Sequence, residues 1–217
     1  MLLSKSKIIL LGIITVFSLS SCSLLSLGEK KSETIVFKNN VYKTVISPYT
    51  KRIWLDRNIG AQQLCTSATD EKCMGDYYQW GSINADTFIA VPFTSDWDES
   101  DPNGIRRMAF LNKTDGSGMC PVGFRVPSQR EFLDEAFEIS KDLSAYDFFM
   151  KIPFSGYRFS SGDLLRKGKL AYFWTSTAKE STSSRVGMHA NGQPYTGGAS
   201  GNMRGEAYNI RCIKSNN

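Results

Sequence analysis

The sequence predicts an α+β domain with short antiparallel strands, one or two helices and long loops. Many short apolar or alternating segments are separated by turn residues, which is typical of antiparallel strands. One segment has helical apolar spacing, and the stretch from about Ser82 to Met119 has little periodicity and many Asp, Asn, Gly and Ser residues. Together these patterns define the α+β class. About 180 residues follow the N-terminal segments, enough for one domain with a real core or two small ones.

A β-hairpin is predicted at the start of the domain, over residues 34–46. Ile35 and Phe37 alternate with polar neighbours, Asn39 and Asn40 can adopt positive φ, and the alternation then resumes. Further strands are predicted at 53–60, 151–159, 161–168, 170–178, 184–192 and 206–214.

One helix is predicted from residue 128 onward. Ser128 is suited to the N-cap position, and Glu131 three residues later completes a capping box. Apolar residues follow at helical spacing: Phe132, Leu133, Ala136, Phe137 and Ile139. This spacing predicts a helix whose apolar face is buried.

The first residues have the layout of a secretory signal. Lys5 and Lys7 precede an apolar run from Ile8 to Leu19. This run is shorter than the about 20 apolar residues that span a bilayer. The residues that follow it, Ser20, Ser21 and Cys22, complete a segment that resembles a bacterial lipobox.

The lipobox resemblance implies cleavage before Cys22 and attachment of lipid to its thiol. Several acyl chains on one residue give durable anchoring, because each buried CH₂ contributes about 0.8 kcal/mol. Ser23 stands where Asp would favour retention in the inner membrane, so the resemblance implies an outer-membrane lipoprotein. The protein would lie on the periplasmic face or on the surface face of that membrane. The expected organisation is a signal peptide over 1–21, a tether over 22–33 and one domain over 34–217.

The charge balance argues against a nucleic-acid-binding protein. Loss of Lys5 and Lys7 with the signal leaves 24 basic and 21 acidic residues, a net charge of +3. The basic residues are dispersed along the chain, whereas a nucleic-acid-binding protein concentrates them on one face.

Four cysteines remain after Cys22 is assigned to lipid, and an exported chain meets an oxidising compartment where disulfides persist. Cys65 and Cys73 flank a short polar, turn-rich segment and are expected to pair, which leaves Cys120 for Cys212. The alternative is four free buried thiols. A zinc site is disfavoured because the chain has no CxxC pair and a single histidine.

Several segments, in order, resemble the major paralogous domain first described in Fibrobacter succinogenes, a family of secreted domains grouped with C-type-lectin-like folds. The matching segments are IWLDRNIGA (53–61), GDYYQWG (75–81), CPVGFRVPSQREF (120–132), IPFSGYRFSSG (152–162), AYFWTSTA (171–178) and YNIRCIK (208–214). The resemblance implies a lectin-like fold in which the first and last strands pair. It also implies a long-range disulfide between Cys120 and Cys212, in agreement with the pairing above.

No catalytic group is expected. A Ser-His-acid triad would need His189, which lies in an alternating segment without a nucleophile motif and is expected on a strand surface. Formylglycine-generating enzymes, which share single motifs with this chain, use a copper-binding cysteine pair ahead of the terminal RC motif. The corresponding segment here, residues 201–210, contains no cysteine.

Calcium is the one metal with a candidate site. Asp96, Asp98, Asp101 and Asn103 lie close together in one loop, and calcium takes six to eight oxygen ligands. The spacing departs from an EF-hand loop, which would have a bidentate Glu at the position of Arg107. The alternative is a solvated acidic loop.

Aromatic rings on a loop surface could bind carbohydrate, because a flat ring offers apolar area to the face of a sugar. Trp54, Trp80 and Trp174 lie in the shared motifs and are expected in the core, so Trp97 is the better surface candidate. The Gly-rich run 192–205 is a candidate binding loop with Tyr195, Asn202 and Arg204 as its contact residues.

The expected function is a non-enzymatic, surface-anchored binding or adhesion module for glycans or envelope components. It relies on fold analogy. The alternatives are an enzyme or protein-modifying factor on the same scaffold, and a purely structural envelope protein.

Overall fold

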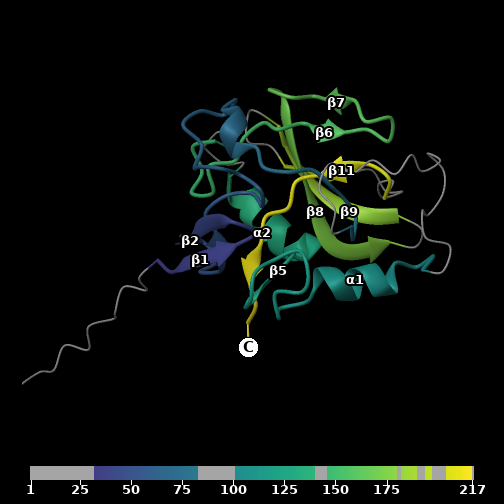
Figure 1. Ribbon diagram of the computed structural model, residues 1–217. Helices are drawn as coiled ribbons and strands as arrows, with labels where there is room; N and C mark the ends of the chain where they lie inside the picture. Colours follow the sequence, from purple (N-terminus) through teal and green to yellow (C-terminus); the bar gives the residue numbers. More distant parts are fainter. Residues whose placement is uncertain are drawn as a thin grey trace, which may run out of the picture. The chain divides into compact units, whose positions relative to one another are not determined.

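The computed structural model describes residues 32–82, 101–139, 146–179, 182–189, 194–196 and 204–216. They belong to one unit, Ser32–Asn217. The strands among these described residues form three largely antiparallel sheets, accompanied by two α-helices and a short 3₁₀ helix (Figure 1). The α+β class predicted from the sequence is therefore confirmed.

The largest sheet has the order β1-β2-β3-β12-β5. Its strands are β1 (Thr34–Phe37), β2 (Asn40–Ile46), β3 (Ile53–Leu55), β12 (Ile213–Lys214) and β5 (Phe124–Arg125). The predicted hairpin is confirmed, but its turn lies one residue earlier than expected. Lys38 and Asn39 have φ values of 46° and 62°, because Phe37 already pairs with Asn40.

The expected pairing of the first and last strands is wrong. β12 pairs with β3 through Ile213 and Trp54, and with β5 on its other side, whereas β1 pairs with β2. β2 and β3 therefore separate the first strand from the last within the same sheet. Near this pairing the chain is cross-linked, since Cys120 is bonded to Cys212 with Cα atoms 5.9 Å apart.

The second sheet has the order β10-β9-β8. Its longest strand, β8, lies between the two clusters of buried residues that make up the core. Its strands are β8 (Leu170–Lys179), β9 (Thr182–His189) and β10 (Pro194–Thr196). Tyr172 and Trp174 of β8 belong to one cluster of buried residues, while Ala171 and Phe173 belong to the other. This alternation is the period-two pattern of a strand covered on both faces. Trp54, Trp80 and Trp174 are all fully buried, as predicted.

A third sheet has the order β4-β11-β6-β7. It contains β4 (Tyr78–Gln79), β11 (Ala207–Tyr208), β6 (Tyr157–Arg158) and β7 (Leu164–Leu165). The strand predicted over 206–214 is thus two short strands, β11 and β12. Asn209, between these two strands, instead forms backbone hydrogen bonds with Tyr172 and Trp174 of β8. Its side-chain amide donates to the Met74 and Asp76 carbonyls.

The predicted helix forms as α2 (Gln129–Ile139), with its capping box intact. Ser128 accepts a bond from the Glu131 backbone at 3.3 Å, and the Glu131 carboxylate accepts from the Ser128 backbone at 2.8 Å. Both bonds satisfy N–H groups that lack partners within the helix.

A second helix, α1 (Ile105–Leu111), lies where the sequence predicted loops. Its pattern is inverted for an amphipathic helix, since Ile105 is 62% exposed while Arg107 is buried. Asp101 supplies the start signal, because its carboxylate accepts from the backbone N–H groups of Arg106 and Arg107. That signal stands four residues ahead of the helix, outside the usual N-cap position.

The short 3₁₀ helix η1 (Glu71–Cys73) carries the other disulfide, which joins Cys65 to Cys73 with Cα atoms 5.0 Å apart. Both pairings predicted from the sequence are therefore present. Within the part of the chain that the structure describes, none of the helices has the length and apolar character needed to cross a bilayer. Cys22 and the predicted signal lie outside the described residues.

Candidate functional site

Two hollows lie at opposite ends of strand β8. The first, here called the basic groove, consists of two adjoining cavities of about 490 and 420 Å³ that share Arg166 and Lys169. Its other lining residues are Tyr157, Leu164, Leu165, Lys167, Leu170, Tyr172 and His189. The groove therefore combines apolar and aromatic surface with several cationic side chains.

A close backbone approach builds the groove. Gly156 has a φ of 70°, and a Cβ added to it would lie 2.2 Å from the Leu165 carbonyl oxygen. Only a residue without a side chain permits this contact. The Gly156 N–H donates to Leu170 and the Gly168 N–H donates to Phe154, both at 2.8 Å. These bonds hold the turn between β7 and β8, which carries the basic side chains of the groove.

Tyr157 and Tyr172 line the groove, and the buried Tyr208 from a third strand packs against them. The rings of Tyr157 and Tyr172 meet edge to face with centroids 5.1 Å apart, and Tyr172 stacks on Tyr208 at 5.5 Å. The Arg185 guanidinium lies 4.1 Å from the Tyr172 ring centroid and donates to the Tyr208 hydroxyl at 2.8 Å. Edge-to-face and cation-π contacts of this kind fix the ring orientations.

A partly buried carboxyl adjoins this cluster. Burial raises the pKa of Glu206, and the bond donated by the Tyr208 hydroxyl together with the charge of Arg185 offsets only part of that effect. Burial and the Glu206 charge in turn raise the pKa of Tyr157. The groove itself presents exposed cations, since Arg166, Lys167 and Lys169 are all exposed. Of these, Lys167 forms an ion pair with Glu71.

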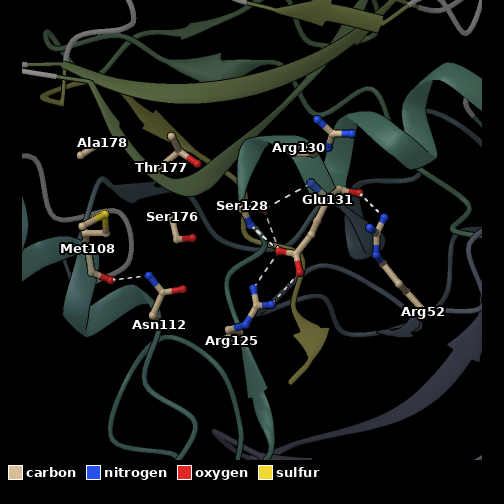
Figure 2. A pocket seen from close by; sticks show the side chains of 10 residues that line it. All are labelled: Arg52, Met108, Asn112, Arg125, Ser128, Arg130, Glu131, Ser176, Thr177 and Ala178. Carbon is tan, nitrogen blue, oxygen red and sulfur yellow. Dashed lines mark hydrogen bonds and ion pairs between the residues drawn. The ribbon is translucent and has the colours of Figure 1, made fainter. Parts of the chain in front are cut away.

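The second hollow, here called the arginine pocket, has a volume of about 660 Å³ (Figure 2). It is lined by Arg52, Met108, Asn112, Arg125, Ser128, Arg130, Glu131, Ser176, Thr177 and Ala178. The lining comes from α1, from the end of β5, from the first turn of α2 and from the last residues of β8. Figure 2 shows Arg125 and Ser128 converging on the Glu131 carboxylate.

Electrostatics in the arginine pocket centre on Glu131. Burial alone would raise its pKa, but the bonds from Arg125 and Ser128 outweigh burial and lower the pKa to about 2. Arg52 pairs with Asp134 at 2.8 Å. Glu131 is therefore ionised at neutral pH, and its charge is matched by a guanidinium.

The binding residues predicted on the Gly-rich run are not brought together as a surface. Arg204 is only 1% exposed, so the structure does not present it on a surface. Its guanidinium lies 4.8 Å from the Trp80 ring centroid and donates to Ser183 at 3.1 Å and to the Pro102 carbonyl at 3.0 Å. Tyr195 is on β10, where its backbone pairs with Gly187. Asn202 and Trp97 lie outside the described residues.

The calcium candidate is only partly within the described chain. Asp96 and Asp98 lie outside it, and Asn103 is exposed. Asp101 is buried, and its carboxylate accepts from the Arg107 side chain at 3.0 Å as well as from the helix backbone. Its oxygens are therefore engaged by α1. In the described ranges, no three His, Cys, Asp or Glu side chains group together as metal ligands.

Sequence reasoning missed both hollows, although each left a local trace. The groove turn appears as RKGK (166–169), where three cations surround a glycine. The pocket includes the capping box of α2, which the sequence indicated only as a helix start. His189 is exposed on β9, as predicted, and lies at the groove.

Neither a family model, nor a curated protein, nor a solved structure matches this chain.

Proposed function

We propose that this chain is an outer-membrane lipoprotein, anchored through Cys22, whose lectin-like major paralogous domain binds an anionic carbohydrate without transforming it. The basic groove is its binding site. The proposal joins three independent supports: the lipobox-like N-terminus, the disulfide-linked α+β domain, and the chemistry of the groove.

The export part of the proposal is supported by the cysteines. Cys22 follows small residues at the end of an apolar run, and the two disulfides are of the kind that persist in an oxidising compartment. The lectin-like assignment is supported by the ordered motifs, by the short antiparallel strands and by the long-range bond between Cys120 and Cys212.

The observation that carries the binding proposal is the combination of tyrosines and cations in one groove. A tyrosine ring offers apolar area to the face of a sugar, and its hydroxyl supplies a polar contact. Tyr157 is half-buried and braced by Tyr172, so its ring is held in place before ligand arrives. Arg166 and Lys169 add positive charge beside it, which favours carboxylated or sulfated sugars over neutral ones.

The test uses the compact unit Ser32–Asn217, produced with both disulfides oxidised. Isothermal titration against polygalacturonate, chondroitin sulfate and neutral dextran, with and without calcium, measures the preference. We expect binding to the two acidic polymers that weakens as salt is added, because exposed charges are screened within about 8 Å at physiological ionic strength. A glycan array widens the panel.

Two variants locate the site. Tyr157→Ala removes the ring and the double change Arg166→Gln with Lys169→Gln removes two charges, and each should weaken binding at least tenfold. Phe137→Ala is the control, since it removes an aromatic side chain that is 55% exposed on α2. Failure to bind any glycan, or equal loss in the control, contradicts the proposal.

An enzyme that cleaves the bound glycan is the second candidate, and Glu206 favours it. A carboxyl whose pKa is raised by burial is a candidate general acid. The release of reducing ends from each polymer, compared between the unaltered chain and Glu206→Gln, decides between binding and cleavage.

A further inference from the structure

The arginine pocket differs from the basic groove in both place and chemistry. Tyr172 of the groove and Thr177 of the pocket are five residues apart on β8, a separation of roughly 16 Å at the rise of an extended strand. No lining residue is shared between the two hollows. A ligand in the pocket is thus a different ligand, or a different part of one, from that in the groove.

Positive charge dominates the lining of the pocket. It contains three arginines against one carboxylate, that of Glu131. Glu131 accepts from both terminal nitrogens of Arg125, at 2.8 and 2.6 Å, and from the backbone and hydroxyl of Ser128 at 2.8 and 2.9 Å. Its oxygens are therefore fully engaged within the protein, and they are not open to a second cation.

One guanidinium of the pocket remains available to a ligand. Arg130 is exposed and makes no hydrogen bond or ion pair within the described ranges, whereas Arg52 and Arg125 both hold carboxylates. In Figure 2 no dashed line joins Arg130 to the other labelled residues. The five donors of a guanidinium lie in a plane and match the oxygens of phosphate or sulfate in pairs.

Two hydroxyls on the β8 side of the pocket are open to a ligand. Ser176 is only 4% exposed, lines the pocket, and its side chain makes no hydrogen bond to any described residue. Beside it, the Thr177 hydroxyl accepts from the Gln129 N–H at 3.0 Å, and its own proton has no acceptor among these residues. Both hydroxyl groups therefore remain free to donate to an acceptor that enters the pocket.

From these groups we infer that the arginine pocket binds the phosphate or sulfate group of a larger molecule. Arg130 supplies the charge, and the hydroxyls of Ser176 and Thr177 donate to the remaining oxygens. A metal cation is excluded by the surrounding guanidinium groups. The cavity of about 660 Å³ is larger than one such anion, so the rest of the ligand occupies the remaining space beside Met108 and Ala178.

The test is a titration of the oxidised unit Ser32–Asn217 with inorganic phosphate, and separately with sulfate, at constant ionic strength and with chloride as the balancing anion. Binding is followed by the NMR shifts of backbone amides near Ser128 and Ser176. We expect saturable shifts, and a tenfold or greater weakening in Arg130→Gln and in Ser176→Ala.

The second variant separates a binding role from a structural one. Because the Ser176 hydroxyl has no partner in the fold, Ser176→Ala should leave the melting temperature unchanged or raise it while weakening phosphate binding. Lys43→Gln, which removes an exposed charge from β2, is the matched control and should bind phosphate as the unaltered chain does. Absence of saturation, or equal affinity in Arg130→Gln and Lys43→Gln, overturns the inference.

A further arm identifies the source of the anion. Cosedimentation with phosphatidylglycerol vesicles that is lost in Arg130→Gln assigns the site to a lipid headgroup, with phosphatidylcholine vesicles as the blank. Phosphate binding without cosedimentation assigns it to a soluble or polymer-borne ester. These readouts do not involve the basic groove, so phosphate binding by a chain that binds no polysaccharide would contradict the proposed function alone.

Discussion

The carboxylate of Glu131 and the guanidinium of Arg125 form a two-point ion pair across the first turn of α2, with N···O distances of 2.6 and 2.8 Å. The two residues are six positions apart, and the pair joins the end of β5 to the start of the helix. One carboxylate thus completes the capping box and fixes where the helix departs from the sheet.

This pair makes stability depend on pH in a defined direction. The pKa of Glu131 is about 2 in the fold against 4.5 for a free glutamate side chain, so the stabilising contribution is fully present above pH 4.5 and is lost as the pH falls toward 2. Glu131→Gln should lower the free energy of unfolding by about 2 to 3 kcal/mol at pH 7, and by much less near pH 2. Urea unfolding at several pH values measures the difference.

Glu71→Gln is the control for that measurement. Glu71 pairs with Lys167 at the surface, where its side chain is 75% exposed, and exposed pairs contribute about 0 to 1 kcal/mol. A loss in Glu131→Gln that stayed constant from pH 7 to pH 2 would show that the ion pair is not its cause.

Local signals explain what the sequence predicted well. The capping box of α2 depends on residues three positions apart, and the hairpin of β1 and β2 depends on a turn between neighbours. Both can be recognised without knowledge of the rest of the fold. The disulfide between Cys65 and Cys73 could be predicted for the same reason, because it closes a short polar segment.

Non-local contacts explain what the sequence missed. Helix α1 was not predicted because it buries a charged residue, Arg107, against Trp80 and Asp101. The helix therefore lacks the usual spacing of apolar residues. Arg204 was predicted on the surface because it lies in a Gly-rich run, yet Trp80 provides a buried ring for it. The groove depends on the close approach of Gly156 to the Leu165 carbonyl, nine residues away. The hydrophobic pattern of the sequence does not indicate such a contact.

The long-range disulfide should contribute more stability than the short one. Cys120 and Cys212 are separated by 92 positions, and Cys65 and Cys73 by 8. In the chain-entropy model the first closure stabilises by about 4 to 5 kcal/mol and the second by about 2 to 3. Cys212→Ser should therefore lower the melting temperature more than Cys73→Ser does. The double variant Cys120→Ser with Cys212→Ser should have the same melting temperature as Cys212→Ser. An unchanged melting temperature in Cys212→Ser or in the double variant would contradict the bond between Cys120 and Cys212.

Arg204 should matter for folding rather than for ligand contact. Arg204→Met keeps most of the apolar volume over Trp80 but removes the donors to the Pro102 carbonyl and to Ser183, so the free energy of unfolding should fall by about 2 to 4 kcal/mol. Arg130→Met, at an exposed position of α2, should change it by less than about 0.5 kcal/mol. Chemical denaturation compares the two, and equal stabilities would show that the buried contacts of Arg204 contribute nothing.

Gly156 and Gly168 offer a matched test of how the groove is built. Their φ values, 70° and 77°, carry a similar backbone penalty for alanine, on the order of 1 kcal/mol. An added Cβ at Gly168 meets nothing within 4 Å, whereas at Gly156 it would lie 2.2 Å from the Leu165 carbonyl oxygen. Gly156→Ala must therefore also push the turn between β7 and β8 away from β6. We expect it to lose at least 1 kcal/mol more in urea unfolding than Gly168→Ala, because overpacking costs typically 1 to 3 kcal/mol. The amide shifts of Leu164 and Leu165, which lie at least three positions from Gly168, should move in Gly156→Ala and much less in Gly168→Ala. The same effect in both variants would place the cause in backbone conformation rather than in the close approach.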